Sequence, residues 1–203
     1  MKQFWHESVT GESFRLLQKL ATSHDFVLIG GWAAYLHTRT QKSKDIDIVV
    51  GFDELRKLDA EFSLVKNERL RKYEIKQGEV DVDIYVPKFS RLSYPPERML
   101  AEHETIDGIK VANLEQLLLL KIGAYEARKG SAKGEKDAID IVALLVAKEF
   151  DAGKFGGLAN DASLEKPMET LRKIAGEFPD SALPFVGISF VDFKKWRKGF
   201  LKE

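Results

Sequence analysis

The sequence predicts an α/β fold of the α+β kind, with a mixed sheet flanked by helices and an all-helical C-terminal half. An apolar segment at 26–30 ends in two glycines and is followed by an alanine-rich segment, a pattern typical of a strand, a turn and a helix. Two later segments, 45–50 and 80–86, alternate polar and apolar residues with the period of a strand. Beyond about residue 113 the pattern is helical. These observations predict one sheet in the N-terminal half and a helical region after it.

The composition is that of a chain able to bury a hydrophobic core. Hydrophobic residues make up 44% of the 203 residues and charged residues 32%. The 32 basic and 32 acidic side chains cancel, so we do not expect the whole surface to attract nucleic acid or an anionic membrane. The absence of cysteine excludes disulfides, thiolate zinc sites and cysteine nucleophiles. Apolar stretches fall far short of the ~20 residues that span a bilayer, and the first residues lack a signal-peptide pattern, so we expect a cytoplasmic protein without a membrane partner.

The remaining elements follow from the same two periodicities. Gln77-Gly78 is a typical hairpin turn between two strands. In chain order we expect a helix at 13–21, a short helix at 54–60, a hairpin formed by 73–75 and 80–86, and helices at 114–129, 135–148, 164–176 and 189–202. Prolines 87, 95 and 96 are expected to end the sheet region. The expected division is an α/β core over residues 1–112 and a helical domain over residues 113–203.

Two of the expected strands carry pairs of acids on one face. Alternation places Asp45 and Asp47 together on the first strand, and Asp81 and Asp83 together on the second. A single acidic strand is more often a solvated sheet face, but two are unusual because neighbouring carboxylates repel each other. Converging carboxylates suit Mg²⁺, which takes one or two of them together with water and substrate phosphate. The sequence thus indicates a divalent-cation site and leaves open which acid of the second strand belongs to it.

The glycine pair after the first strand is a candidate phosphate site. Gly30 and Gly31 allow the backbone to approach a ligand closely, and the helix that follows directs free N–H groups toward it. A glycine pair alone is more often only a turn. Here 13 residues separate Gly31 from Asp45, enough for one helix to return the chain to a neighbouring strand, so the turn and the carboxylates can meet. Ser43, just before Asp45, is a further candidate contact for phosphate.

The order and spacing of these residues resemble the signature of the polymerase-β-like nucleotidyltransferase superfamily. In this sequence the signature consists of Ile29-Gly30-Gly31, the strand with Asp45 and Asp47, and a third acid, for which Asp83 is our choice and Asp81 the alternative. Within the superfamily, the chain is similar to minimal nucleotidyltransferases related to type IV abortive-infection toxins, which carry a later lysine and a KDxxD element. Lys121 and residues 136–140 match these two features. The resemblance covers roughly residues 26–145.

The resemblance implies an enzyme that transfers a nucleoside monophosphate from an NTP such as ATP to an acceptor hydroxyl, by Mg²⁺- or Mn²⁺-assisted in-line displacement. The implied site residues are the metal-binding and catalytic Asp45, Asp47 and Asp83, with Asp81 as a further metal ligand, and the nucleotide-binding Gly30, Gly31, Ser43 and Lys121. The acceptor is left open between RNA such as tRNA, a protein and a small molecule, and an antitoxin-type protein partner is implied as well. The alternative is a catalytically inactive nucleotide-binding or toxin–antitoxin partner module.

The sequence departs from the superfamily pattern at the glycine turn. The second position of the motif, which in the superfamily is often occupied or followed by serine, reads Gly31-Trp32 in this sequence. We therefore expect that the turn offers no hydroxyl to a phosphate.

Lys121 lies among leucines on the helix expected at 114–129. At 100° per residue it falls in the middle of an apolar stripe with Leu117 and Tyr125. A lysine there either extends its stem along the core to reach water or meets an anion. The candidate anions are a triphosphate, an active-site carboxylate and an acid of the next helix such as Asp140. We expect the triphosphate or an active-site carboxylate.

The last expected helix has an apolar side and a basic side. Phe190, Phe193, Trp196 and Phe200 lie along one side, and lysines and an arginine lie along the other. An amphipathic helix docked on the domain is the more common explanation of this pattern, and a basic edge that holds an RNA acceptor is the alternative.

Overall fold

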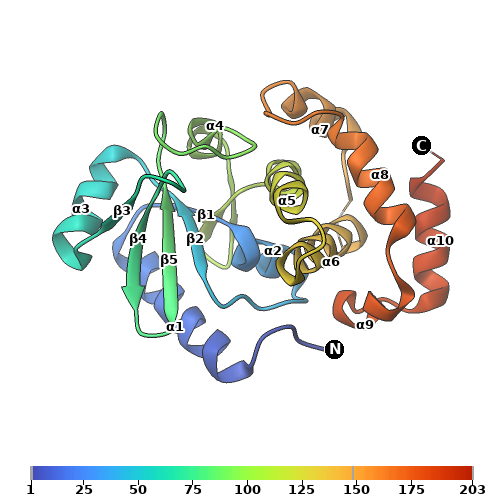
Figure 1. Cartoon of the computed structure of the whole chain (residues 1–203), viewed down its shortest axis with the longest axis horizontal. Coiled ribbons are helices and arrows are strands. Elements are labelled where there is room, and N and C mark those ends of the chain that lie inside the picture. Colours follow the sequence, from blue (N-terminus) through green and yellow to red (C-terminus); the bar gives the residue numbers. More distant parts are fainter. Residues whose placement is uncertain (1, 148, 203) are drawn as a thin grey trace.

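The computed structural model describes residues 2–147 and 149–202, and a seven-stranded mixed sheet lies at the centre of this part of the chain (Figure 1). The strand order is β3-β4-β5-β2-β1-β7-β6. The strands are β1 Val27–Ile29, β2 Ile46–Val49, β3 Val65–Asn67, β4 Lys72–Gln77, β5 Val80–Tyr85, β6 Glu104–Ile106 and β7 Ile109–Val111. A mixed sheet flanked by helices confirms the fold class expected from the sequence.

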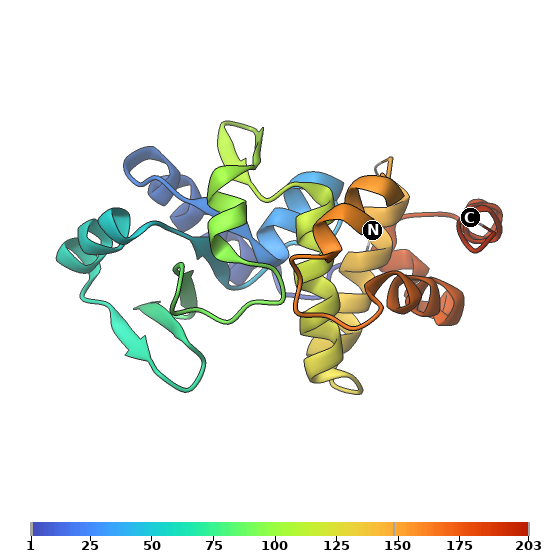
Figure 2. The same cartoon turned by 90° about the horizontal axis from the view of Figure 1, so that it is seen from above.

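Helices flank the sheet and form the C-terminal half (Figure 2). They are α1 Glu7–Ser23, α2 Gly30–Thr38, α3 Phe52–Phe62, α4 Pro96–Ala101, α5 Leu114–Arg128, α6 Ala132–Ala147, α7 Ala152–Ala159, α8 Pro167–Glu177, α9 Leu183–Val186 and α10 Phe190–Phe200, with a 3₁₀ turn at Asp180–Ala182. Helix α2 packs on β1 and β2 and also on α5 and α6. One continuous cluster of buried apolar side chains extends from Leu17 to Phe193, so the sheet and the C-terminal helices share a core. No helix within the described ranges combines the length and apolarity needed to cross a membrane.

The register of the central strands places two of the candidate acids side by side. Strand β2 pairs with β5 in parallel, with Asp47 opposite Asp83. On its other edge β2 pairs with β1 in antiparallel orientation, with Asp47 opposite Ile29, the residue before the glycine turn. Along β5 the apolar residues are buried and the acids alternate with them, as expected. Strand pairing therefore brings the turn and both acids to one place on the sheet.

The sheet continues past Pro87, Pro95 and Pro96, which corrects the expectation that these prolines end it. Strands β6 and β7 form an antiparallel pair after them, and β7 pairs in parallel with β1. Pro96 lies in the first turn of α4, where proline is favoured because the first N–H groups of a helix have no partner within it. Strands of three residues are too short to show a period, so β3, β6 and β7 are missing from the expected elements.

The helices expected in the C-terminal half are present with shifted ends, as α5, α6, α8 and α10. Helices α7 and α9 are additional. Helix α6 begins at Ala132 rather than at residue 135, and residue 148, its expected end, lies outside the described residues. The expected boundary between residues 112 and 113 falls between β7 and α5, and the division into two domains stays a prediction.

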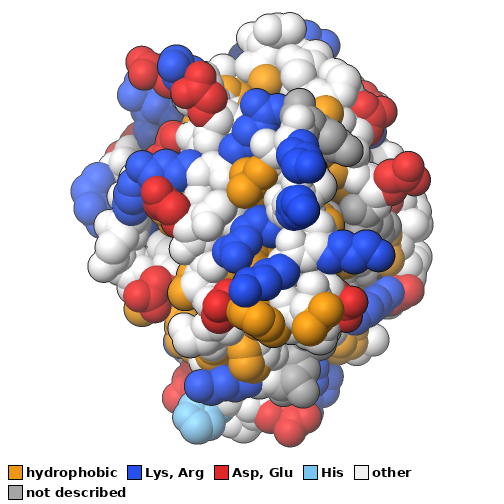
Figure 3. All heavy atoms as spheres, turned by 90° about the vertical axis from the view of Figure 1, so that its right-hand side faces the viewer, with side chains coloured by type: hydrophobic (Ala, Val, Ile, Leu, Met, Phe, Trp, Pro, Cys, Tyr) orange, Lys and Arg blue, Asp and Glu red, His pale blue; other side chains and the backbone are white. Residues whose placement is uncertain are grey.

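Helix α10 docks through aromatic side chains. Phe193 is fully buried, and the Trp196 ring stacks on the rings of Phe193 and Phe200, with centroid distances of 5.5 and 5.2 Å. Phe190 is instead 44% exposed, and Lys194 lies over its ring. Lysine and arginine side chains gather on the face that carries the C-terminal helices (Figure 3). The docking explanation thus holds for three of the four aromatic residues, and a role in RNA binding stays a prediction.

The turn between β1 and α2 depends on Gly30. Its φ angle of +70° lies in the left-handed region that favours glycine. A Cβ atom on Gly30 would also collide with the side chain of Asp47. The absence of a side chain therefore lets the backbone of the turn lie directly against Asp47.

We predict that Gly30→Ala destabilises the fold more than Gly78→Ala. Both glycines have a positive φ, +70° and +62°, but a Cβ on Gly78 meets nothing within 4 Å, whereas one on Gly30 meets Asp47. Left-handed backbone costs an ordinary residue about 1–2 kcal/mol. In urea unfolding, the additional loss in Gly30→Ala measures the close approach to Asp47. Equal free energies of unfolding in the two variants would contradict this explanation.

Candidate active site

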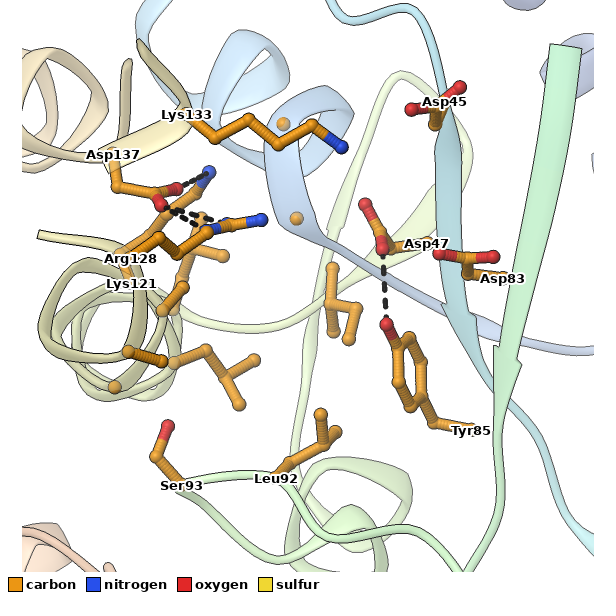
Figure 4. A pocket seen from close by; sticks show the side chains of 18 of the residues that line it. Asp45, Asp47, Asp83, Tyr85, Leu92, Ser93, Lys121, Arg128, Lys133 and Asp137 are labelled. Carbon is orange, nitrogen blue, oxygen red and sulfur yellow. Dashed lines mark hydrogen bonds and ion pairs between the residues drawn. The ribbon is translucent and has the colours of Figure 1, made fainter. Parts of the chain in front are cut away.

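A cavity of about 710 Å³ opens between the central strands and helices α5 and α6 (Figure 4). Two groups of charged side chains face each other across it. The acidic wall consists of Asp45, Asp47 and Asp83, and the basic wall consists of Lys121, Arg128, Lys133 and Lys136. Gly30, Gly31 and Ser43 line the cavity as well. All residues expected at the site except Asp81 are therefore brought together.

The acidic wall is built on strands β2 and β5. Asp47 and Asp83 lie side by side in register, and the Tyr85 hydroxyl donates a hydrogen bond to Asp47 Oδ1 at 3.4 Å. The Lys72 ammonium from β4 lies 2.6 Å from Asp83 Oδ2. The other oxygen of Asp83, Oδ1, is buried and has no hydrogen-bond partner. Buried polar atoms are rarely left unpaired, so this oxygen is available for a ligand.

The environment of the acidic wall opposes negative charge. Burial, and then the neighbouring Asp83, raise the pKa of Asp47 to about 6. Burial also raises the pKa of Asp83, although Lys72 opposes the change. When both carboxylates are ionised, the positive charge around them is thus too small to neutralise the pair. Such a pair is suited to a divalent cation or to proton transfer.

The residues present fit a divalent ion that takes further ligands from elsewhere. Among the described residues, no group of three or more Asp, Glu or His side chains is arranged to hold a metal ion by itself. Mg²⁺ needs only one or two protein carboxylates when water and phosphate complete its shell. Asp47 and Asp83, with the unpartnered Oδ1 and with Asp45 on the same wall, meet this requirement.

Asp81 lies apart from the cavity. On β5 it is opposite Lys76, and the two side chains form an ion pair at 2.9 Å. The side chain of Asp81 is 40% exposed, and the residue is not part of the cavity lining. Of the two acids that the sequence leaves open, Asp83 is the one beside Asp47.

The turn itself carries no hydroxyl, and the hydroxyl nearest to Gly31 in the cavity lining is that of Ser43, which the sequence offered as a candidate. Ser43 is buried in the cavity lining, and a Cβ atom on Gly31 would lie 2.5 Å from Ser43 Oγ. Trp32 is buried in the core, and its Nε1 donates a hydrogen bond to Ser13 Oγ at 2.8 Å. The loop before β2 thus places a hydroxyl in space left free because residue 31 has no side chain.

Three residues of the basic wall, Lys121, Arg128 and Lys136, belong to a charge network between α5 and α6, in which the two lysines are buried and Arg128 is 40% exposed. Lys121 Nζ lies 2.6 Å from Asp140 and 3.3 Å from Asp137. Lys136 lies 3.0 Å from Asp140, and Arg128 lies 2.7 Å from Asp137. Both acids are on one face of α6 because they are three residues apart. With all five groups ionised, three cations face two anions, which leaves one excess positive charge beside the cavity.

Lys121 meets an acid of the next helix, the alternative that we did not favour from the sequence. Burial lowers its pKa, but Asp140 and then Asp137 outweigh burial, so that the pKa of Lys121 is raised. The pKa of Lys136 is lowered by burial and by Lys121, although Asp140 opposes both. Lys121 also lines the cavity, so it can face a bound ligand as well as these acids. Its contact with a nucleotide stays a prediction.

The site residues expected from the sequence leave out several cationic side chains that line the cavity: Lys72, Arg91, Arg128, Lys133 and Lys136. Lys136 opens the KDxxD element, and Arg128 lies seven residues after Lys121 on the same helix, so both had a signal in the sequence. Lys133 extends from α6 into the space that faces Asp45 (Figure 4). Lys72 and Arg91 had no signal of their own, because only the pairing of β4 with β5 and the path of the chain after β5 bring them here.

Comparisons with known proteins support the fold. No protein-family model matches the chain, and no curated protein matches it either. The chain is similar to the structure of an antigenic nucleotidyltransferase-like protein from Paracoccidioides brasiliensis, with a TM-score of 0.50 and 19% identity over 87% of this chain and 92% of that one. It is also similar to JHP933 from Helicobacter pylori, with a TM-score of 0.50 and 13% identity over 97% of this chain and 93% of that one. The chain therefore shares the fold of these two structures, and its similarity to nucleotidyltransferases of the abortive-infection kind stays a prediction.

We predict that Asp47→Asn stabilises the metal-free protein at pH 7. The pKa of Asp47 is about 6 in the folded protein against 3.8 in an unfolded chain, so the folded state loses stability as the pH rises from about 4 to 6. Asparagine removes this loss, which is on the order of 1–3 kcal/mol at neutral pH. Urea unfolding in EDTA should give Asp47→Asn a larger free energy of unfolding than wild type at pH 7, and this difference should shrink at pH 4. A gain of the same size at both pH values would show that the charge of Asp47 is not its cause.

We predict that Lys121→Met destabilises the protein by about 3 kcal/mol, because it leaves Asp140 and Asp137 buried with less compensating charge. Lys129→Met, at an exposed lysine just after α5, is the control and should change little. Adding Asp140→Asn to Lys121→Met should restore part of the loss. Unfolding free energies of the three variants test the network, and a loss below about 1 kcal/mol in Lys121→Met would contradict it.

Proposed function

We propose that the protein is a nucleotidyltransferase that moves a nucleoside monophosphate from an NTP to an acceptor hydroxyl, assisted by Mg²⁺ or Mn²⁺. The observation that carries the proposal is the opposition of the acidic and basic walls across one cavity. A metal–triphosphate complex has the same polarity, with divalent cations at one end and phosphate oxygens at the other. The nucleotidyltransferase-like fold supports the general kind of reaction.

The acidic wall would hold the metal and receive the acceptor. Asp45, Asp47 and Asp83 are the residues that would bind the ion, which when bound supplies charge stabilisation to the attacking and leaving oxygens. Asp83 has a buried oxygen without a partner, suited to accept the proton of the acceptor hydroxyl. The acceptor oxygen forms a bond to the α-phosphorus, the bond to the bridging oxygen breaks, and pyrophosphate leaves.

The glycine turn and the basic wall would hold the phosphates. Gly30 and Gly31 form the first turn of α2, where backbone N–H groups have no partner within the helix. Ser43 adds a hydroxyl beside them. Across the cavity, the excess positive charge of the network around Lys121 and Arg128 attracts the triphosphate. The acids of α6 keep these cations in place, so that little reorganisation is needed when the substrate binds.

The acceptor hydroxyl belongs to RNA such as tRNA, to a protein or to a small molecule, and an experiment has to separate these classes. An antitoxin-type partner protein and cytoplasmic localisation also belong to the proposal.

We predict that the protein transfers label from an NTP carrying ³²P at the α-phosphate. Each NTP is incubated with protein, Mg²⁺ and either whole-cell RNA, whole-cell protein or a small-molecule extract, and the fraction that takes label identifies the acceptor class. Asp83→Asn should reduce transfer at least about a hundredfold because it removes a proton acceptor and a metal ligand. Asp81→Asn is the matched control on the same strand face and should retain most activity, since Asp81 lies outside the cavity lining.

Two outcomes would contradict the proposal. Transfer that is equally fast in wild type and Asp83→Asn would place the reaction elsewhere. Metal-dependent NTP binding without transfer to any fraction would instead favour the inactive nucleotide-binding module.

A further inference from the structure

Lys72 already places a positive charge on the acidic wall. Its ammonium lies 2.6 Å from Asp83 Oδ2 and 3.0 Å from Glu74 Oε1, and its side chain is only 12% exposed. It lines the same cavity as Asp45 and Asp47. The Lys72 ammonium is therefore paired with Asp83, a carboxylate that a divalent ion would bind.

The pairing of β4 with β5 provides Lys72 with a second partner. Glu74 lies opposite Asp83 in the register of the two strands, and Lys72 bridges their carboxylates. Glu74 also forms an ion pair with Lys76 at 3.3 Å and accepts a hydrogen bond from the Asn67 side chain at 3.0 Å. Lys72 can therefore leave Asp83 without losing contact with a carboxylate, because its ammonium is already within reach of Glu74.

Lys76 is the natural comparison for Lys72. It lies four residues along the same strand, on the same face, and also bridges Glu74 and an acid of β5, at 2.9 Å from Asp81. Its side chain is 54% exposed, and it does not line the cavity. Of this pair of lysines, only Lys72 contacts an acid of the acidic wall.

We propose that Lys72 competes with a divalent ion for Asp83: it neutralises this carboxylate in the free protein and shifts to Glu74 when the ion binds. The inference rests on the proposed function, since it concerns the same metal site. An ammonium and a divalent cation on the two oxygens of one carboxylate repel each other strongly at low solvent exposure, so each weakens the binding of the other. A triphosphate adds ligands to the ion and so favours displacement of Lys72. Lys72 thus makes metal binding weak in the free protein and dependent on the nucleotide.

The test is a Mn²⁺ titration of nucleotide-free protein, with free Mn²⁺ measured by electron paramagnetic resonance. Lys72→Met should bind Mn²⁺ at least about tenfold more tightly than wild type, because the competing charge is gone. The Mn²⁺ affinity of Lys76→Met should stay within about twofold of that of wild type. Lys72→Arg keeps the positive charge, so its Mn²⁺ affinity should stay as weak as that of wild type. Adding Asp83→Asn to Lys72→Met should abolish the gain.

Thermal melting gives a second measurement on the same proteins. Without metal, Lys72→Met should melt below wild type, because Asp83 and Glu74 lose a cation. Mn²⁺ should raise its melting temperature more than that of wild type, since the ion replaces the missing charge. A Lys72→Met protein that melts normally but binds Mn²⁺ no more tightly than wild type overturns the inference. A gain of equal size in Lys76→Met also overturns it, because it would show a general effect of removing charge.

The label-transfer assay on the same preparations separates this inference from the proposed function. Transfer by wild type together with unchanged Mn²⁺ affinity in Lys72→Met overturns the role of Lys72 and leaves the function standing. Tighter Mn²⁺ binding in Lys72→Met without transfer by wild type supports the role of Lys72 and counts against the function.

Discussion

The parallel pairing of β2 with β5 places two carboxylates, Asp47 and Asp83, next to each other and largely out of water, and the rest of the cavity is arranged around them. Adjacent buried carboxylates raise the free energy of the folded protein. The turn at Gly30 leaves room for one of them, Tyr85 donates a hydrogen bond to it, and Lys72 pairs with the other. These contacts lower the cost but do not remove it. Because the negative charge of the two carboxylates is incompletely neutralised, binding a cation there is favourable.

On the basic wall, in contrast, most of the charged side chains have oppositely charged partners. The acids of α6 neutralise most of the charge of Lys121, Lys136 and Arg128 and hold these side chains in fixed positions. The two sides are connected through α2, whose first turn belongs to the cavity and whose body packs on α5 and α6. The sheet and the C-terminal helices therefore depend on each other for the shape of the cavity as well as for a common core.

Local patterns in the sequence predict the parts of this arrangement that are themselves local. Alternation in the two acidic strands places their acids on one face, and the glycine pair predicts the turn. Alternation alone does not separate Asp81 from Asp83, because they share a face, and only the register with β2 does so. The partners of Lys121 and Lys72 depend on contacts between separate elements, which no single segment encodes. The strands after Pro96 were missed because three residues are too few to show a period.

Gly31 and Ser43 are separated in the sequence by most of helix α2 but lie against one volume beside the glycine turn. A side chain at position 31 would need the space that Ser43 occupies, so a hydroxyl can reach this place from either position but not from both. The two positions are therefore expected to covary in chains with this fold, with a serine at 31 accompanied by a smaller residue at 43. In this chain the hydroxyl beside Gly31 in the cavity comes from the loop before β2, and the glycine turn provides only backbone groups.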